Sequence, residues 1–403
     1  MNYLHNYSTQ CIKDTRFLAS WQGLALGAHS LLFVTIPFYA LASFCILTKT
    51  PKSMESVKYA LVNTHFWCFF NDILLCSLIT PYFFFPAQCS ISLGLFRWLG
   101  IPTSFQTYIG FVTCHWMSFS VVQLFENRSS SILENRFRFR GRHDRSIFYS
   151  INIFIETFYT LPIYMNLPDF ETAVTSILKE VPCPTEEFFT SPVFVLATEP
   201  FLANYMLIST LCIITLFYSQ ILFFCSCCLY YLYYCSNVTN SKQTRRSQQL
   251  FLIGMIAQLV VPFTFIITPL VGFYFSIYSG AYNQLLNNVC VLIFCCHGSA
   301  TSIVIVLVHR PYREYLMTRR RAEYEVKSRT SGTEIIPYIM VMYLPTSSEI
   351  RRVILLSGKS AAEISHESGV NIELIEKFIC REVGLDEILA PDYVALQEWI
   401  LLQ

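Results

Sequence analysis

Charged residues are scarce in this chain of 403 residues, where Asp, Glu, Lys and Arg together make up only 14%. Soluble domains carry about 25% charged residues, so the composition argues against a soluble protein. Hydrophobic residues make up 54%, and Phe alone occurs 35 times. Apolar stretches recur whose lengths approach or exceed the roughly 20 residues that a helix needs to cross a bilayer core. They lie at approximately 23–47, 59–85, 103–125, 147–167, 203–234, 250–275 and 285–308.

The lengths of these stretches decide the fold class. Buried strands of a soluble α/β protein run about four to eight residues, far shorter than the stretches seen here. The chain also lacks an internal repeat and the paired loop pattern of an inverted-repeat transporter. We therefore expect an all-α protein, a bundle of seven transmembrane helices.

A cleavable signal peptide is also missing, because residues 1–22 hold Lys13, Asp14 and Arg16 and no apolar core. Basic residues are unevenly divided between the two sets of loops, 19 against 4. The richer set faces the cytoplasm under the positive-inside rule. We expect a multi-pass plasma-membrane protein with its N-terminus outside and its C-terminus cytoplasmic. The predicted parts are an extracellular N-terminus (1–22), the seven-helix domain (23–309), an amphipathic helix with a linker (310–330) and a cytoplasmic extension (331–403).

Few polar residues fall inside the predicted spans, and such residues usually face the interior of a bundle. Asn71 and Asp72 lie near the middle of the second span, and His297 lies at a similar depth in the seventh. We expect them to form a polar core. Asp72 and His297 could pair directly or through water, or Asp72 could hold a cation or remain protonated and inert.

An acidic and a basic residue end the third span, at Glu126-Asn127-Arg128. An arginine there can simply reach lipid headgroups, whereas a carboxylate gains nothing from anionic lipid. Residues two apart on a helix do not face each other, so Glu126 and Arg128 should contact different neighbours. The alternatives are a conformational latch between helices and a structural anchor.

Several segments in order resemble the nematode serpentine chemoreceptors of class H, which are similar to G-protein-coupled receptors. They are "NTHFWCFFNDILLCSLITPYFFFP" (63–86), "FENR" (125–128), "VPCPTEEFF" (181–189), "RRSQQLFLIGMIAQLVVPFTF" (245–265) and "HGSATSIVIVLVHRPYR" (297–313). The resemblance spans roughly residues 20–320. It implies a sensory receptor that binds an unknown small molecule and signals through a heterotrimeric G protein.

The resemblance also implies roles for individual residues. Glu126, Asn127 and Arg128 take the place of the Asp/Glu-Arg-Tyr switch of rhodopsin-like receptors, although Asn separates acid from base. The run His309, Arg310, Pro311, Tyr312 and Arg313 ends the seventh helix and opens an amphipathic helix on the G-protein side. The Asn-Pro-x-x-Tyr motif of rhodopsin-like receptors is absent.

Candidate ligand contacts lie in the outer half of the predicted bundle: Gln106, Tyr108, Tyr205, Tyr282, Gln284 and Asn288. Cys11, Cys89 and Cys183 fall outside the membrane, where thiols tend to pair. We expect a Cys89–Cys183 bridge, although sequence does not fix connectivity. Of three glycosylation sequons, only the one at Asn6 is extracellular in this topology.

No nucleophile, phosphate-binding or metal-binding pattern stands out, so we expect no enzyme activity, no metal and no cofactor. A seven-helix ligand-gated channel and a transporter are the alternative functions. Insect-type odorant channels place the N-terminus inside, which the basic-residue count opposes.

The C-terminal extension does not belong to the receptor pattern. Residues 359–384 have the apolar spacing of a helix–turn–helix, with Ile364, Val370, Ile372 and Ile375 expected to pack together. Residues 331–403 hold five basic and eleven acidic residues, a balance that argues against nucleic-acid binding. We expect an acidic helical interaction module or, alternatively, an unrelated segment fused to the gene.

Overall fold

The computed structural model describes residues 11, 14–50, 55–234, 242–309, 311–317, 354 and 359–380. The predicted glycosylation site Asn6 and the predicted G-protein contact Arg310 lie outside these residues. The chain forms two compact units, Met1–Ala322 and Glu323–Gln403.

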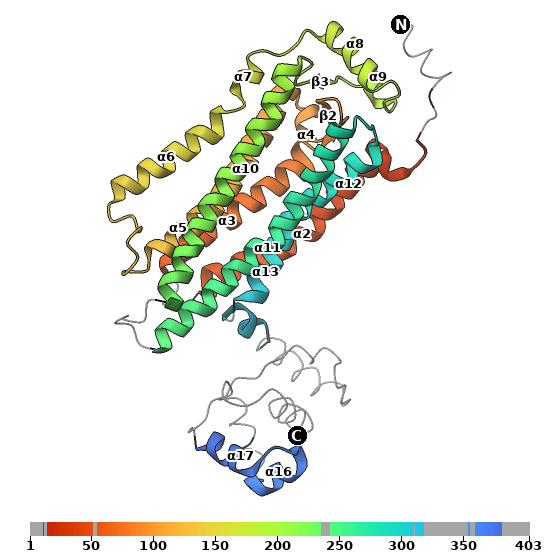
Figure 1. The fold of residues 1–403 in the computed structure, drawn as a ribbon. Coiled ribbons are helices and arrows are strands. Elements are labelled where there is room, and N and C mark those ends of the chain that lie inside the picture. Colours follow the sequence, from red (N-terminus) through yellow and green to blue (C-terminus); the bar gives the residue numbers. More distant parts are fainter. Residues whose placement is uncertain are drawn as a thin grey trace. The chain divides into compact units, whose positions relative to one another are not determined.

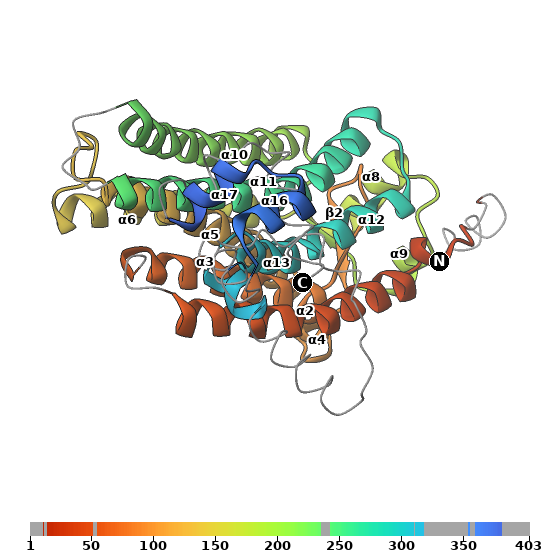
Figure 2. The ribbon, with the colours of Figure 1, turned by 90° about the horizontal axis from the view of Figure 1, so that it is seen from below.

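The first unit is a bundle of long helices that run alongside one another (Figure 1). The long helices are α2 (Trp21–Lys49), α3 (Glu55–Ile73), α5 (Thr103–Ser130), α6 (Arg142–Phe158), α10 (Pro200–Leu229) and α11 (Lys242–Ser279). The seventh span is divided into α12 (Gln284–Cys295) and α13 (His297–Val308). α5 packs against α3, α6 and α10, and α13 packs against α2, α3 and α11 (Figure 2).

The all-α fold class predicted from the sequence is confirmed. Within the part of the chain that the structure describes, four helical spans are long and apolar enough, by length and composition, to cross a membrane: Trp21–Lys49, Thr103–Ser130, Pro200–Tyr234 and Gln284–Val308. Large apolar side chains lie on the outer face of the bundle, with Phe33 80% and Phe201 72% exposed. Such a surface fits hydrocarbon rather than water, because soluble proteins rarely expose large contiguous apolar patches.

The second span ends earlier than predicted. After α3 the helix continues as a π-helical turn, Leu74–Leu78, and strand β1 (Pro81–Phe83) follows. Proline lacks the N–H that the helix would need, and aromatic residues favour strands, so the run from Pro81 to Phe85 leaves the helix. β1 pairs antiparallel with β2 (Cys89–Ser92), which in turn pairs with β3 (Phe194–Val195).

This sheet lies at the same end of the bundle as Ser20, the start of α12 and the short helices α4 (Leu95–Trp98), α8 (Phe170–Glu180) and α9 (Glu187–Thr190) (Figure 1). We call it the hairpin end. The opposite end, where α5 finishes, is called the Arg128 end. Near the hairpin end α6 is followed by one short turn, α7 (Leu161–Tyr164), and at the Arg128 end α10 finishes in a π-helical turn, Tyr230–Tyr234.

The second unit contains the predicted helix–turn–helix as α16 (Ala361–Ser368) and α17 (Ile372–Ile379). Ser360 and Glu363 form a capping box at the start of α16, and Gly369 turns the chain with a left-handed φ of 74°. Ile364, Val370 and Ile375 are buried as expected. Ile372 is 42% exposed, so its predicted burial is wrong: as the first residue of α17 it lies off the buried face.

Candidate functional site

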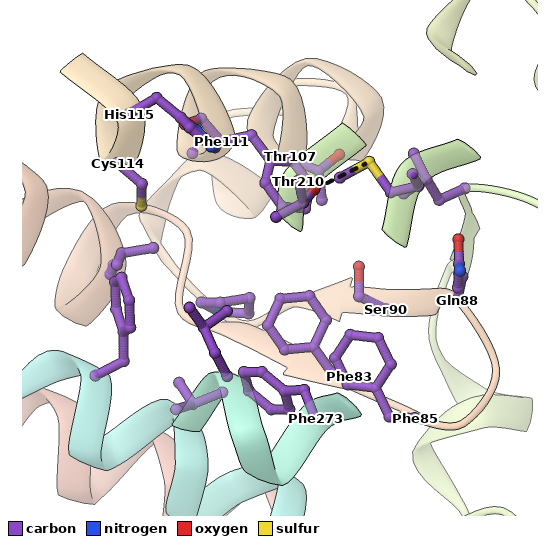
Figure 3. A pocket seen from close by; sticks show the side chains of 18 of the residues that line it. Phe83, Phe85, Gln88, Ser90, Thr107, Phe111, Cys114, His115, Thr210 and Phe273 are labelled. Carbon is purple, nitrogen blue, oxygen red and sulfur yellow. Dashed lines mark hydrogen bonds between the residues drawn. The ribbon is translucent and has the colours of Figure 1, made fainter. Parts of the chain in front are cut away.

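A cavity of about 250 Å³ lies in the half of the bundle nearer the hairpin end. Its wall comes from α5, α10, α11, α12 and the β1–β2 hairpin (Figure 3). The lining is mostly aromatic and aliphatic, with Phe83, Phe85 and Phe273 grouped on one side. Among the described residues that line the cavity, none is Asp, Glu, Lys or Arg. The cavity therefore suits a small uncharged molecule.

His115 is a lining residue that the sequence analysis missed. Its Nδ1 lies 2.6 Å from the carbonyl oxygen of Phe111, and its Nε2 lies 3.0 Å from the hydroxyl of Tyr159. A carbonyl only accepts, so Nδ1 donates, and the neutral ring accepts the Tyr159 hydroxyl at Nε2. Both nitrogens are occupied, and the ring joins α5 to the chain just after α6. The sequence signal that could have identified His115 is its position as an ionisable residue inside an apolar helix.

Of the six predicted ligand contacts, Gln106 lines the cavity. Its amide is already engaged, however, because Oε1 accepts from Ser92 Oγ and Nε2 donates to the carbonyl of Ile101. Tyr108 and Tyr205 turn away, since their hydroxyls donate to the carbonyls of Thr157 and Tyr159 at 2.8 Å. These two tyrosines fix α5 and α10 to α6 and the chain just after it.

The remaining three predicted contacts hold neighbouring segments, the hairpin and the chain before α2, in place from α12 and its approach. Gln284 Nε2 donates to the carbonyl of Phe83 at 3.0 Å, and Asn288 Nδ2 donates to that of Leu18 at 2.8 Å. Asn287, which the sequence analysis missed, donates to the carbonyl of Phe85 at 2.9 Å. We call Gln284, Asn287 and Asn288 the amide clamp. Tyr282 adds a bond from its hydroxyl to Gln284 Oε1 at 2.8 Å.

The predicted Cys89–Cys183 bridge is wrong. Cys183 is bonded to Cys11, 172 residues earlier in the chain. Cys89 is a free, buried residue of β2, and its neighbour across the sheet is Val195. The position before the third span suggested Cys89, but the strand turns that side chain into the packed interior, away from the N-terminal segment.

This pairing predicts that Cys11→Ser and Cys183→Ser destabilise the protein equally, by about 2–4 kcal/mol, since either change removes the constraint on a long loop. Cys89→Ser keeps the bridge and serves as the matched control. The measurement is mobility on non-reducing gels together with the thermal midpoint. A loss of the bridge in Cys89→Ser would contradict the assignment.

The predicted polar core is buried, with Asn71, Asp72 and His297 each at most 3% exposed. Asp72 accepts a bond from the Tyr39 hydroxyl at 3.3 Å and packs against Gly298, the residue after His297. Within the described part of the chain, no hydrogen bond joins Asp72 to His297, and His297 Nδ1 has no partner. Asp72 therefore meets Tyr39 of the first span and the backbone of Gly298 rather than the His297 ring.

At the Arg128 end, Glu126 connects two helices. Its fully buried carboxylate accepts from Arg145 Nη2 at 2.9 Å and from the Tyr149 hydroxyl at 2.6 Å, both on α6. Arg128 is also buried and lies beside Cys228 of α10. Glu126 and Arg128 thus contact different neighbours, as their spacing predicts. The sequence analysis did not name Arg145 and Tyr149 as partners of Glu126. Their four-residue spacing, which places both on one face of α6, was the available signal.

Two residues that follow α13, His309 and Tyr312, are buried. The Tyr312 hydroxyl lies 2.7 Å from Thr50 Oγ1 at the end of α2. Pro311 opens a short helix, residues 311–317, in keeping with the preference of proline for the first helical position. Arg313 is exposed, and its guanidinium donates to the carbonyl of Leu307 at 3.3 Å. Tyr312 therefore ties the end of α2 to the short helix that follows α13.

A bundle of apolar helices with a cavity near one end and a buried acid–arginine cluster at the other fits the fold of seven-transmembrane receptors. Comparison with known proteins gives the particular class. The profile described as "Serpentine type 7TM GPCR chemoreceptor Srh" matches residues 19–320. The chain is also 37% identical to Serpentine receptor class H-72 of Caenorhabditis elegans over 314 residues, 78% of this chain and 90% of that protein.

The chain belongs to the Srh family of serpentine seven-transmembrane chemoreceptors. The resemblance stated from the sequence is confirmed. Membership of a receptor family does not favour the two alternative functions considered from the sequence, a ligand-gated channel and a transporter. The matched residues end before α16 and α17.

Proposed function

We propose that this protein is a chemosensory receptor that binds a small molecule in the cavity and passes the signal to a heterotrimeric G protein at the Arg128 end. The observation that carries the proposal is the uncharged, largely aromatic cavity between five elements of the bundle. Its wall includes α10 and α11, so an occupant would touch helices that run from one end of the bundle to the other.

The proposed orientation places the hairpin end outside the cell and the Arg128 end in the cytoplasm. The Cys11–Cys183 bridge lies at the hairpin end, and disulfides persist in oxidising compartments. The basic residues Arg136, Arg140 and Arg142 follow α5 at the other end and are exposed, as expected for a cytoplasmic loop.

The proposed signalling surface uses the Arg128 end. Glu126 with Arg145 and Tyr149, and Tyr312 with Thr50, join pairs of helices there. Such contacts can differ between two arrangements of the bundle, which is what a switch requires. For the acidic unit that holds α16 and α17, we propose a cytoplasmic interaction module, supported by its separate compact fold.

The cavity is tested by filling it. Thr210 of α10 lines the cavity, and Thr210→Trp should abolish the ligand response, a loss of at least a hundredfold in potency, because the indole occupies the binding volume. Thr215 lies on the same helix with its side chain exposed, so Thr215→Trp is the matched control. G-protein activation is measured in cells with surface expression held equal.

A Thr210→Trp receptor that reaches the surface and responds with wild-type potency would exclude the cavity as the ligand site. Loss of response in both variants would point to a general effect of tryptophan on α10 and would equally count against the proposal.

A further inference from the structure

We infer that the cavity selects a small, neutral molecule with a hydroxyl or carbonyl group, and that Ser90 of the hairpin is the residue that recognises this group. This inference rests on the proposed role of the cavity as the ligand site.

Residues directly opposite each other on neighbouring strands share one face of a sheet. Ser90 lies opposite Phe83 of β1 and opposite Phe194 of β3. All three residues line the cavity. The sheet therefore presents a row to the cavity in which one hydroxyl stands between two phenyl rings. Figure 3 shows the Ser90 hydroxyl directed into the open space beside Phe83.

The hydroxyl of Ser90 is available to a ligand. Among the described residues, no side chain or carbonyl forms a hydrogen bond with Ser90 Oγ, although the residue as a whole is only 4% exposed. Other polar groups of the wall are already bonded: Ser118 Oγ donates to the carbonyl of Cys114, and Cys114 Sγ donates to Asn71 Oδ1. Ser90 is thus an unused donor and acceptor in an apolar wall.

Gln88 lies in the bend that precedes β2, and its side chain also lines the cavity (Figure 3). Its Nε2 donates to the carbonyl of Ala203 at 3.1 Å, which fixes the orientation of the amide. In the described part of the chain, Gln88 Oε1 has no donor, but this atom is buried within the wall and does not face the open space. The polar group that the hairpin offers to a ligand is therefore Ser90 Oγ.

Ser90 selects for a neutral oxygen group. Its Oγ can donate to the oxygen of an alcohol or of an aldehyde, and it can accept from a hydroxyl, whereas a hydrocarbon offers it no partner. Ammonium and carboxylate groups would be buried without a countercharge, which is costly. The volume of about 250 Å³ lies below the roughly 300–1,000 Å³ of pockets for drug-sized ligands, so the molecule is small.

The test uses purified full-length receptor and probes that share a phenyl skeleton: benzyl alcohol, benzaldehyde, toluene, benzylamine and benzoate. Binding is measured from the ligand-induced rise in thermal midpoint across a concentration series. Ser90→Ala should weaken benzyl alcohol and benzaldehyde roughly tenfold each, the value of one hydrogen bond to a buried group, and leave toluene unchanged. Because each probe is compared between two receptors, its partitioning into detergent cancels.

Ser118→Ala is the matched control, since it removes a cavity-lining hydroxyl that is already bonded within its own helix. It should change the affinity of none of these probes. The inference is overturned if benzyl alcohol fails to bind up to its solubility limit. It is equally overturned if Ser90→Ala behaves like Ser118→Ala, or if benzylamine or benzoate binds more tightly than the alcohol.

The same measurements separate this inference from the proposed function. Alcohol binding that depends on Ser90, in a receptor whose signalling survives Thr210→Trp, would support the hydroxyl site and exclude its role in signalling. Signalling that is lost in Thr210→Trp but is indifferent to Ser90→Ala for every probe would have the opposite meaning.

Discussion

Gly298→Ala should prevent most of the receptor from reaching the cell surface. A Cβ at this position would run into the Tyr39 hydroxyl and the Asp72 carboxylate. Both belong to packed helices, so the clash separates α13 from α2 and α3. Overpacking of this kind costs about 3 kcal/mol, a large part of the stability of a typical domain. The measurement is surface expression together with the thermal midpoint in detergent.

Gly110→Ala is the control for this change, because a Cβ on Gly110 would meet Ile79 at an ordinary contact distance of 3.5 Å. The double variant Tyr39→Phe with Gly298→Ala should recover part of the loss, since it removes one of the two obstructing oxygens. Wild-type expression of Gly298→Ala, or the absence of any recovery in the double variant, would show that these three helices do not approach as described.

Arg145→Gln should destabilise the receptor far more than Glu126→Gln. The Glu126 side chain is 0% exposed, whereas that of Arg145 is 35% exposed. Removal of the arginine leaves a buried carboxylate with neutral donors alone, which costs about 3–5 kcal/mol. Removal of the carboxylate leaves a cation that water reaches, which costs about 1–2 kcal/mol, and the double variant should resemble Glu126→Gln. Thermal midpoints of the four receptors complete the cycle.

Arg142→Gln is the matched control, because Arg142 lies on the same helix with its side chain exposed. Its midpoint should stay within the experimental error of wild type. Equal losses for Glu126→Gln and Arg145→Gln that add in the double variant would mean that the ion pair contributes no coupling, and that Glu126 is an anchor within α5.

The helices were predictable because a helix that crosses a bilayer needs about 20 apolar residues. Each such helix therefore appears in the sequence as one long apolar stretch. The separation of Glu126 from Arg128 also followed from helical spacing. The hairpin was not predictable in the same way. The apolar run continues from α3 through Phe85, so hydropathy alone gives no sign of the point where Pro81 ends the helix.

The cavity wall was the least predictable part of the candidate site. Tyr282, Gln284 and Asn288 were expected to meet a ligand because they are polar and near one end of the bundle, and five of the six predicted contacts instead serve other elements. Side-chain amides and hydroxyls satisfy backbone carbonyls as readily as ligands, and sequence does not distinguish the two uses. Ser90 was missed because its meaning depends on strand register, which sequence does not give.

The amide clamp has a consequence for which side chains of the hairpin can vary. Gln284 and Asn287 bind the carbonyl oxygens of Phe83 and Phe85, and Asn288 binds that of Leu18 in the segment before α2. A backbone carbonyl is present whichever side chain stands at the position. The side chains at 83, 85, 88 and 90 can therefore be exchanged while the hairpin keeps its place, so the lining of the cavity can change without any change in the helices that hold it.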